Sequence, residues 1–164
     1  MSRKITELLN SNLQSSLSDQ AMSALTAFRE EADSRNLLSL LDIKRGQVFV
    51  LGDDVLPNIR FVVDMANSRA YLEAEICVFP TTVADEVDAL ITHTNVLLSH
   101  GRCYQEDNQI FYEAYIEGIS DDSYEEVDLM AGLMMSCFEE DHDVVDALWV
   151  KVSELPRPTC PRAS

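Results

Sequence analysis

The amino-acid sequence predicts an α+β fold in which helices pack on an antiparallel sheet. Changes of hydrophobic period support this prediction. Apolar residues recur at the 3.6-residue spacing of a helix as far as residue 41, and from residue 46 they recur at the two-residue spacing of strands. Helical and strand spacings then alternate to give the order helix, three strands, helix, two strands, helix. With 164 residues, of which 46% are hydrophobic and 25% charged, the chain suits a globular domain with one core.

Residues 1–41 are expected to be helical, in one or two pieces. Ser18 is a suitable N-cap for the second piece, because its hydroxyl can accept a hydrogen bond from a free N–H of the first turn. The first piece is short, so residues 1–15 are expected either to pack on a partner or to form a mobile arm. The apolar positions that define the two pieces are Ile5, Leu8, Leu9 and Leu13, followed by Leu25, Phe28, Ala32, Leu37, Leu38, Leu40 and Leu41.

Three strands are expected at residues 47–51, 59–65 and 70–78, with turn residues at 66–69. In the third strand, polar and aromatic side chains alternate with apolar ones. One face of an antiparallel sheet can therefore be buried while the other faces water. The segment is predicted to be an antiparallel meander, which Pro80 ends.

A helix over residues 83–98 is expected next. Thr82 and Asp85 form a cap-like pair at its start, and Gly101 is interpreted as its C-cap. A hairpin follows, with strands at 102–105 and 109–116 and a polar turn between them.

The last helix is expected to begin at a capping box formed by Ser123 and Glu126 and to extend, with or without a break, to Val152. Met130 and Met134 lie on its apolar stripe, whereas Met135 falls off the stripe and is predicted to be on the surface.

The chain is strongly acidic, with a net charge of −17 and a pI near 4.3. Residues 47–154 hold 23 Asp and Glu against four Lys and Arg, a net charge of −19, whereas residues 1–46 are neutral. Such a field repels nucleic acid and anionic membranes and attracts basic protein segments. Acidic residues also keep a globular domain soluble. Solubility alone therefore stays open as an explanation of the charge, beside the attraction of basic partners.

No catalytic or metal-binding motif is recognised. His93 and His100 lie two helical turns apart, and His142 stands in an acidic run, residues 139–143, that lacks the alternation and the glycine of a calcium loop. Cys103 close to His100 gives only a weak indication of a nucleophile. The four cysteines form no Cys-x-x-Cys pair, which favours a reducing cytoplasm. A non-enzymatic binding protein without metal or cofactor is expected.

The order of elements resembles the type III secretion chaperone fold and the YbjN-like family that shares it. The likeness covers residues 37–152. It rests on the meander at 48–78, the helix at 83–98 followed by Ser99-His100-Gly101-Arg102, the hairpin across 107–109 and the capped helix from Ser123. A single α+β domain is expected over residues 37–155. The helical extension over residues 1–36 is longer than the short first helix usual in this fold and departs from the resemblance. Pro156, Pro158 and Pro161 predict a disordered tail over residues 156–164.

The resemblance also implies two interactions. One is a homodimer that pairs through the middle helix and the adjacent strand, at Leu90, Thr94, Leu97, Leu98, Cys103 and Tyr104. The other is a protein client, a non-globular segment of a secreted effector, which lies along Leu37, Leu41, Val48, Val50 and Phe61. A regulatory or stress protein of the same fold without a secretion client is the first alternative. A small enzyme with an unrecognised site is the second.

Overall fold

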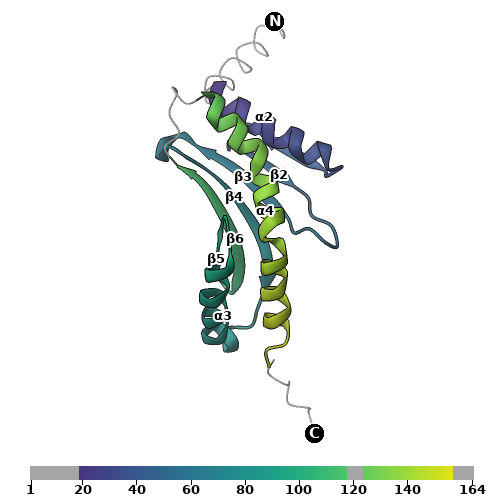
Figure 1. Cartoon of the computed structure of the whole chain (residues 1–164), viewed down its shortest axis with the longest axis vertical. Helices are drawn as coiled ribbons and strands as arrows, with labels where there is room; N and C mark the ends of the chain where they lie inside the picture. The colour runs from purple at the N-terminus through teal and green to yellow at the C-terminus, as the bar shows by residue number, and fades with distance from the viewer. Residues whose placement is uncertain (1–18, 118–123, 157–164) are drawn as a thin grey trace, which may run out of the picture.

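The computed structural model describes residues 19–117 and 124–156 (Figure 1). Its helices are α2 (Asp19–Ser34), α3 (Ala84–Leu97) and α4 (Tyr124–Ser153). Its strands are β1 (Ser39–Asp42), β2 (Gln47–Val50), β3 (Ile59–Asp64), β4 (Arg69–Val78), β5 (Arg102–Glu106) and β6 (Gln109–Glu117). Short 3-10 turns occupy Met65–Asn67 and Thr81–Val83.

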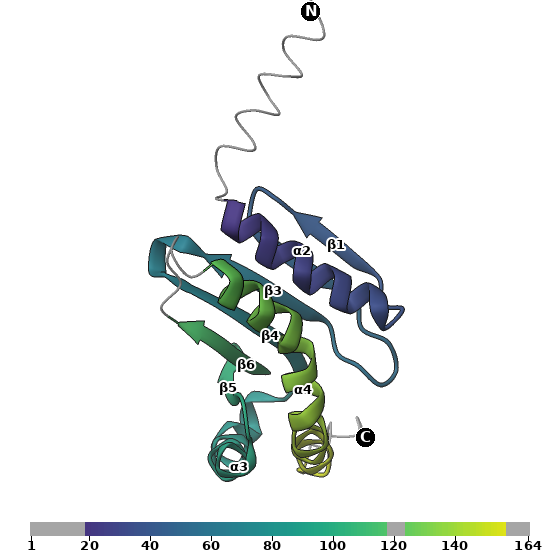
Figure 2. The same ribbon diagram turned by 45° about the horizontal axis from the view of Figure 1, so that its top comes forward.

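The strands form one six-stranded antiparallel sheet in the order β1-β2-β3-β4-β6-β5. Helices α2 and α4 lie side by side on one face of the sheet, α2 over β1 to β3 and α4 over β4 and β6 (Figure 2). Helix α3 packs beside α4 and strand β5. The described helices leave the opposite face of the sheet open. The predicted α+β fold class is confirmed.

Strand β1 corrects one element of the prediction, because residues 37–41 were expected to be helical. Helix α2 ends at Ser34, and Asn36 beyond it has a left-handed φ of 58°. The Leu37 N–H then donates to the Ala32 carbonyl (3.1 Å) and the Asn36 N–H to the Asp33 carbonyl (3.0 Å). This is the bonding of a Schellman motif, which turns the chain out of the helix. The leucines that follow pair with β2 instead of continuing α2.

The core lies between the helices and the sheet. Phe28 of α2 stacks on Phe61 of β3, with 4.6 Å between ring centroids, and Tyr112 of β6 meets Phe138 of α4 edge to face at 5.1 Å. Helix α2 therefore shares one core with the sheet. The buried residues of α4 repeat in the heptad manner of a packed helix: Ala131, Met134, Met135, Phe138, Asp141, Val145, Leu148 and Val152.

The stripe of α4 corrects the prediction for its methionines. Met135 is fully buried, whereas Met130, which was assigned to the core, is exposed. The predicted apolar stripe started at Val127 and was displaced by about one residue around the helix. In the structure, the buried face of α4 is the one that carries Phe138 and Leu148.

The ends of α3 also differ from the prediction. The helix begins after the 3-10 turn without a side-chain cap from Thr82, and it ends at Leu98, whose backbone is extended. Gly101 is no helix cap. A Cβ at Gly101 would lie 2.4 Å from the Tyr112 ring and 2.6 Å from the Glu113 carbonyl oxygen, so this position needs glycine for close approach.

Other predicted features stand as follows. The tight hairpin turn before β6 is confirmed by the positive φ angles of Asp107 (50°) and Asn108 (60°). Helix α4 continues to Ser153 without a break. The Ser18 cap, the stripe at residues 5–13, the Ser123–Glu126 capping box and residues 157–164 of the predicted tail lie outside the part of the chain, or the side chains, that the structure describes.

Candidate protein-binding surface

The predicted client-binding residues separate into two groups. Val48, Val50 and Phe61 are fully buried in the core beneath α2. They cannot contact a client in this structure because α2, through Phe28, already covers them. Leu37 and Leu41 are half-buried at the outer margin of the same core and remain partly accessible.

The predicted dimer residues do not form one surface either. Thr94 and Cys103 are buried between α3, β5 and α4, and Leu90 and Leu98 pack partly against the core. Tyr104 lies on the open face of the sheet, where its hydroxyl donates to Glu73 at 2.7 Å. Leu97 is exposed on α3. Of the six residues, Leu97 is the one placed to meet a second copy.

Strand β1 is a free edge of the sheet, since among the described residues it pairs with β2 alone. The Leu51 N–H donates to the Leu38 carbonyl at 3.0 Å. In an antiparallel ladder hydrogen-bonded pairs alternate with non-bonded ones. Leu38, Leu40 and Asp42 therefore bond inward to β2, and the N–H and C=O groups of Ser39 and Leu41 point outward.

The side chains along this edge are apolar. Leu38 is 73% exposed and Leu40 is 64% exposed. Natural proteins protect sheet edges with charges, prolines or bulges, because an open edge invites another strand. None of these lies within β1 before Asp42. Leu38 and Leu40 were not predicted to be surface residues, because they were assigned to a helical stripe. The segment Leu37-Leu38-Ser39-Leu40-Leu41 has no apolar–polar alternation that would have marked it as a strand.

A row of side chains crosses the open face from this edge to the other. Cross-strand pairing places Leu40 beside Phe49, Phe49 beside Arg60, and Arg60 beside Glu73. Glu73 then faces Glu113, which faces Arg102. The open face thus continues the apolar edge into a charged and aromatic surface. A cavity of about 280 Å³ lies over its β2–β4 part, lined by Arg45, Gln47, Phe49, Asn58, Arg60, Glu73 and Glu75.

The open face also holds three of the four cations of the acidic segment 47–154, namely Arg60, Arg69 and Arg102. Each pairs with an acid directly across the ladder: Arg60 with Glu73 at 2.7 Å, Arg69 with Asp64 at 3.6 Å, and Arg102 with Glu113 at 2.5 Å. Arg69 also lies over the rings of Tyr71 and Tyr115, at 5.5 and 5.9 Å. Paired charges and aromatic rings make this face less anionic than the segment as a whole.

The acidic run of α4 contains a buried carboxylate that the sequence analysis missed. Asp141 accepts the backbone N–H groups of Ser99 (2.7 Å), His100 (3.0 Å) and Gly101 (3.0 Å). It also accepts the Tyr112 hydroxyl at 2.8 Å. Burial raises the pKa of Asp141. The four hydrogen bonds together lower this pKa by a larger amount, so the net shift is downward. Asp141 fixes the loop that joins α3 to β5.

The weak nucleophile hypothesis for Cys103 and His100 has no support in the geometry. Burial raises the pKa of the Cys103 thiol to about 12, so it stays protonated at neutral pH. The His100 ring contacts Glu140 at 2.5 Å, on the exposed side of α4.

Within the described ranges, no three side chains of the metal-binding types gather in one place. No helix in these ranges is both long and apolar enough to cross a membrane.

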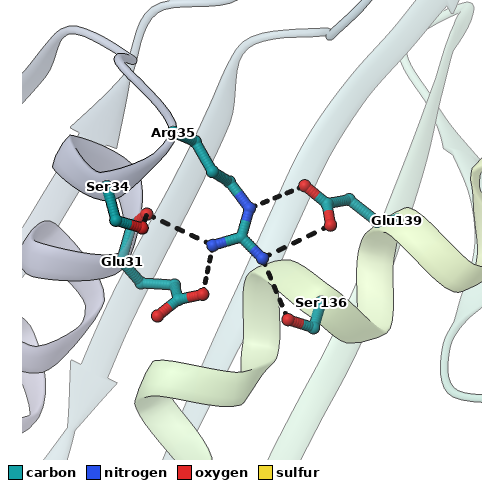
Figure 3. A network of polar contacts seen from close by, with 5 residues as sticks. All are labelled: Glu31, Ser34, Arg35, Ser136 and Glu139. Carbon is teal, nitrogen blue, oxygen red and sulfur yellow. Dashed lines mark hydrogen bonds and ion pairs between the residues drawn. The ribbon is translucent and has the colours of Figure 1, made fainter.

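A polar network holds α2 in position over the sheet. Figure 3 shows the Arg35 guanidinium between Glu31 of α2 and Glu139 of α4. Arg35 Nε donates to Glu139 at 2.7 Å, and Nη2 donates to the Ser136 hydroxyl at 2.9 Å. Because Arg35 directly precedes Asn36, the network also fixes the point where the chain leaves α2 for the β1 edge.

Comparison with known proteins gives structural likeness alone. No protein-family model and no curated protein matches the sequence. A chain of the ExsC–ExsE complex aligns over 87% of this chain and 100% of its own length, with a TM-score of 0.54 and 18% identity. YbjN from E. coli aligns over 82% of this chain and 96% of its own, with a TM-score of 0.53 and 13% identity.

A chain of the heterodimeric ExoU–SpcU complex, from the type III secretion system of Pseudomonas aeruginosa, covers 68% of this chain and 81% of its own. Its TM-score of 0.38, at 13% identity, is too low to support an argument. The chain therefore shares its fold with YbjN and with a chain of the ExsC–ExsE complex.

Proposed function

We propose that this protein is a non-enzymatic binding module that holds a non-globular segment of a client protein. The client is a secreted protein, bound in the cytoplasm before export. The observation that carries the proposal is the β1 edge, whose outward backbone groups have no strand partner among the described residues and lie beside two exposed leucines.

Strand addition is the binding mode that this edge favours. An extended client segment pairs its backbone with the outward groups of Ser39 and Leu41, and its alternate side chains contact Leu38 and Leu40. On the helical side, the half-buried Leu37 and Leu41 supply apolar contact for the remaining side chains. Main-chain bonds provide affinity that tolerates varied client sequences, as a holding protein requires.

The fold comparison supports a protein-binding role. A chain of a two-protein complex, ExsC–ExsE, has the same fold. The high negative charge fits the same role, because it keeps the protein soluble while apolar edge residues are displayed.

We further propose that the protein is a homodimer through the outer face of α3. Val96 and Leu97 are exposed there, with Leu90 and Leu98 at the margin. Leu97→Glu is expected to give a folded protein that runs as a monomer by light scattering. A wild-type protein that already runs as a monomer overturns this interface.

The client proposal is tested by purifying the tagged protein from the organism that encodes it, under conditions of active secretion. A stoichiometric complex with one secreted protein is expected, identified by mass spectrometry. Leu38→Glu with Leu40→Glu should lose the client, and so should Ser39→Pro, which removes an outward N–H from an edge position that tolerates proline.

Leu129→Glu is the matched control, because Leu129 on α4 is 64% exposed, as Leu40 is. It should keep the client. If the wild-type protein is recovered alone under secreting conditions, the secretion proposal fails. The alternative favoured by the likeness to YbjN, a regulatory or stress protein without a secretion client, then takes its place.

A further inference from the structure

A second surface lies beside Trp149, the one tryptophan of the sequence. A cavity of about 200 Å³ opens between the β2–β3 loop (residues 51–58) and the C-terminal half of α4. We call it the Trp149 groove. Its apolar lining is Val55, Leu56, Pro57, Ile76, Phe138, Val145 and Trp149, and its polar lining is Asp53, Asp54, His142 and Asp146.

The loop wall of the groove is held by its own hydrogen bonds. The Asp53 carboxylate accepts the N–H groups of Val55 and Leu56, each at 2.8 Å, and the Gly52 N–H donates to the Asn58 side chain at 2.9 Å. The His142 ring also contacts the Val55 carbonyl oxygen at 3.1 Å and so links this loop to α4. A wall formed in advance lowers the ordering cost of binding.

Apolar side chains in the groove are accessible to a partner. Val55 is 76% exposed at the loop tip and Trp149 is 49% exposed on α4. Trp149 also lines a smaller neighbouring cavity of about 40 Å³, with Val78, Pro80 and Leu155 among its residues. Trp149 belongs to the lining of both cavities, and both lie along the C-terminal half of α4.

The charged residues that line these cavities are all acidic. Asp53, Asp54 and Asp146 stand around the Trp149 groove, and no Lys or Arg lines either cavity in the described part of the chain. The backbone N–H groups of Leu56 and Val55 lower the pKa of Asp53, which favours its ionised form. An apolar floor with an anionic rim selects for apolar ligands that carry positive charge.

We propose that the Trp149 groove binds a polypeptide segment in which a large apolar side chain is flanked by Lys or Arg. A cavity of roughly 150 Å³ is enough to hold benzene, so the groove has room for an aromatic ring or a branched aliphatic side chain. The flanking cations pair with the aspartates at the rim. This site is separate from the β1 edge and does not rest on the proposed strand addition.

The test uses the synthetic peptide Gly-Lys-Lys-Phe-Leu-Lys-Lys-Gly and the intrinsic fluorescence of Trp149, which reports on this groove because the chain has no other tryptophan. The peptide is expected to shift the emission to the blue in a saturable way as it covers the indole. Two control peptides, one with Glu in place of each Lys and one with Ser in place of Phe and Leu, should leave the emission unchanged.

Variants then separate the charge effect from the apolar effect. The double variant Asp54→Asn with Asp146→Asn is expected to weaken binding of the peptide by about fivefold for each charge removed, at low salt. The control variant Glu30→Gln with Glu86→Gln removes the same number of charges at exposed sites elsewhere. It should leave the affinity for the peptide unchanged. Trp149→Ala, measured by calorimetry, should weaken binding about 30-fold or more, as for a central aromatic anchor, while Val150→Ala should not.

Either of two results of the peptide titration overturns the proposal. One is an emission that the basic peptide leaves unchanged, and the other is equal binding of the basic and acidic peptides. The Ser39→Pro variant distinguishes this site from the β1 edge, because it is expected to keep full affinity for the peptide. Loss of peptide binding in that variant overturns the assignment to the Trp149 groove and leaves the strand-addition proposal standing.

Discussion

Replacing Asp141 by asparagine is expected to destabilise the fold far more than its place in an acidic run suggests. The carboxylate accepts four hydrogen bonds in a buried position, from Ser99, His100, Gly101 and Tyr112. Asparagine has one acceptor oxygen. If that oxygen takes the position of Oδ2, it keeps three bonds, but its amide NH₂ then faces the Ser99 N–H, donor against donor.

The magnitude follows from these contacts. An unsatisfied buried donor costs about 1–3 kcal/mol. Each of the three remaining bonds weakens by about 1 kcal/mol when its acceptor loses its charge. Relief from burying a charge offsets part of this cost. The expected loss in free energy of unfolding at pH 7 is about 3 kcal/mol, a large share of the 5–15 kcal/mol typical of a domain.

Urea unfolding at fixed protein concentration, followed by circular dichroism, measures the loss. Asp143→Asn is the control, because Asp143 is an exposed acid on the same helix, and it should change stability by less than about 0.5 kcal/mol. If the two variants lose equal stability, Asp141 does not hold the loop.

The pH dependence gives a second check on Asp141. Its pKa is lowered in the folded protein, so its contribution is complete above the unfolded-state pKa of about 3.9. The contribution is lost as the pH falls through the lower folded-state pKa. The difference in stability between wild type and Asp141→Asn should therefore be constant from pH 7 to 5 and shrink below about pH 4. A difference that grows on acidification contradicts the assignment.

Three further predictions test other parts of the fold. Gly101→Ala should cost about 2–3 kcal/mol in urea unfolding, because its Cβ meets Tyr112 and rigid backbone, whereas Gly132→Ala on α4, with nothing within 4 Å, should stabilise by about 0.5–1 kcal/mol. Arg35→Met should cost about 1 kcal/mol by loosening α2 from α4, and 1 M NaCl should reduce the difference. Burial raises the pKa of Cys103 to about 12, so alkylation mapped by mass spectrometry at pH 8 should label it slowly until urea unfolds the protein.

Most of the sheet could be predicted from the sequence because each strand has a local signal. Strand β4 alternates polar or aromatic residues with apolar ones, and β3 and β6 are rich in β-branched and aromatic residues, with turn residues between the strands. The Asp107–Asn108 turn is a hairpin signal independent of the core. These signals are local in sequence, so one chain suffices to recognise them.

Strand β1 and Asp141 could not be predicted in this way. The leucines at 37–41 fit helix and strand patterns equally, and the decision lies in the left-handed turn at Asn36 and in pairing with β2. Asp141 occupies a core position of the α4 heptad. A buried carboxylate is stable there only because residues 99–101 and Tyr112, which are distant in sequence, donate hydrogen bonds to it. The Trp149 groove joins segments about 90 residues apart, which periodicity does not bring together.

The two proposed binding surfaces should differ in their response to salt, because the charge of the acidic segment is divided unevenly between the faces. Three of its four cations lie on the open sheet face, each beside an acid, so this face is less anionic than the segment as a whole. In the part of the chain that the structure describes, the Trp149 groove is lined by aspartates and by no Lys or Arg. Raising NaCl from 0.05 to 0.5 M should therefore weaken binding of the basic peptide several-fold and leave capture of a client strand almost unchanged. Equal salt sensitivity at both surfaces would mean that the field of the whole acidic chain, and not the local arrangement of charges, directs its partners.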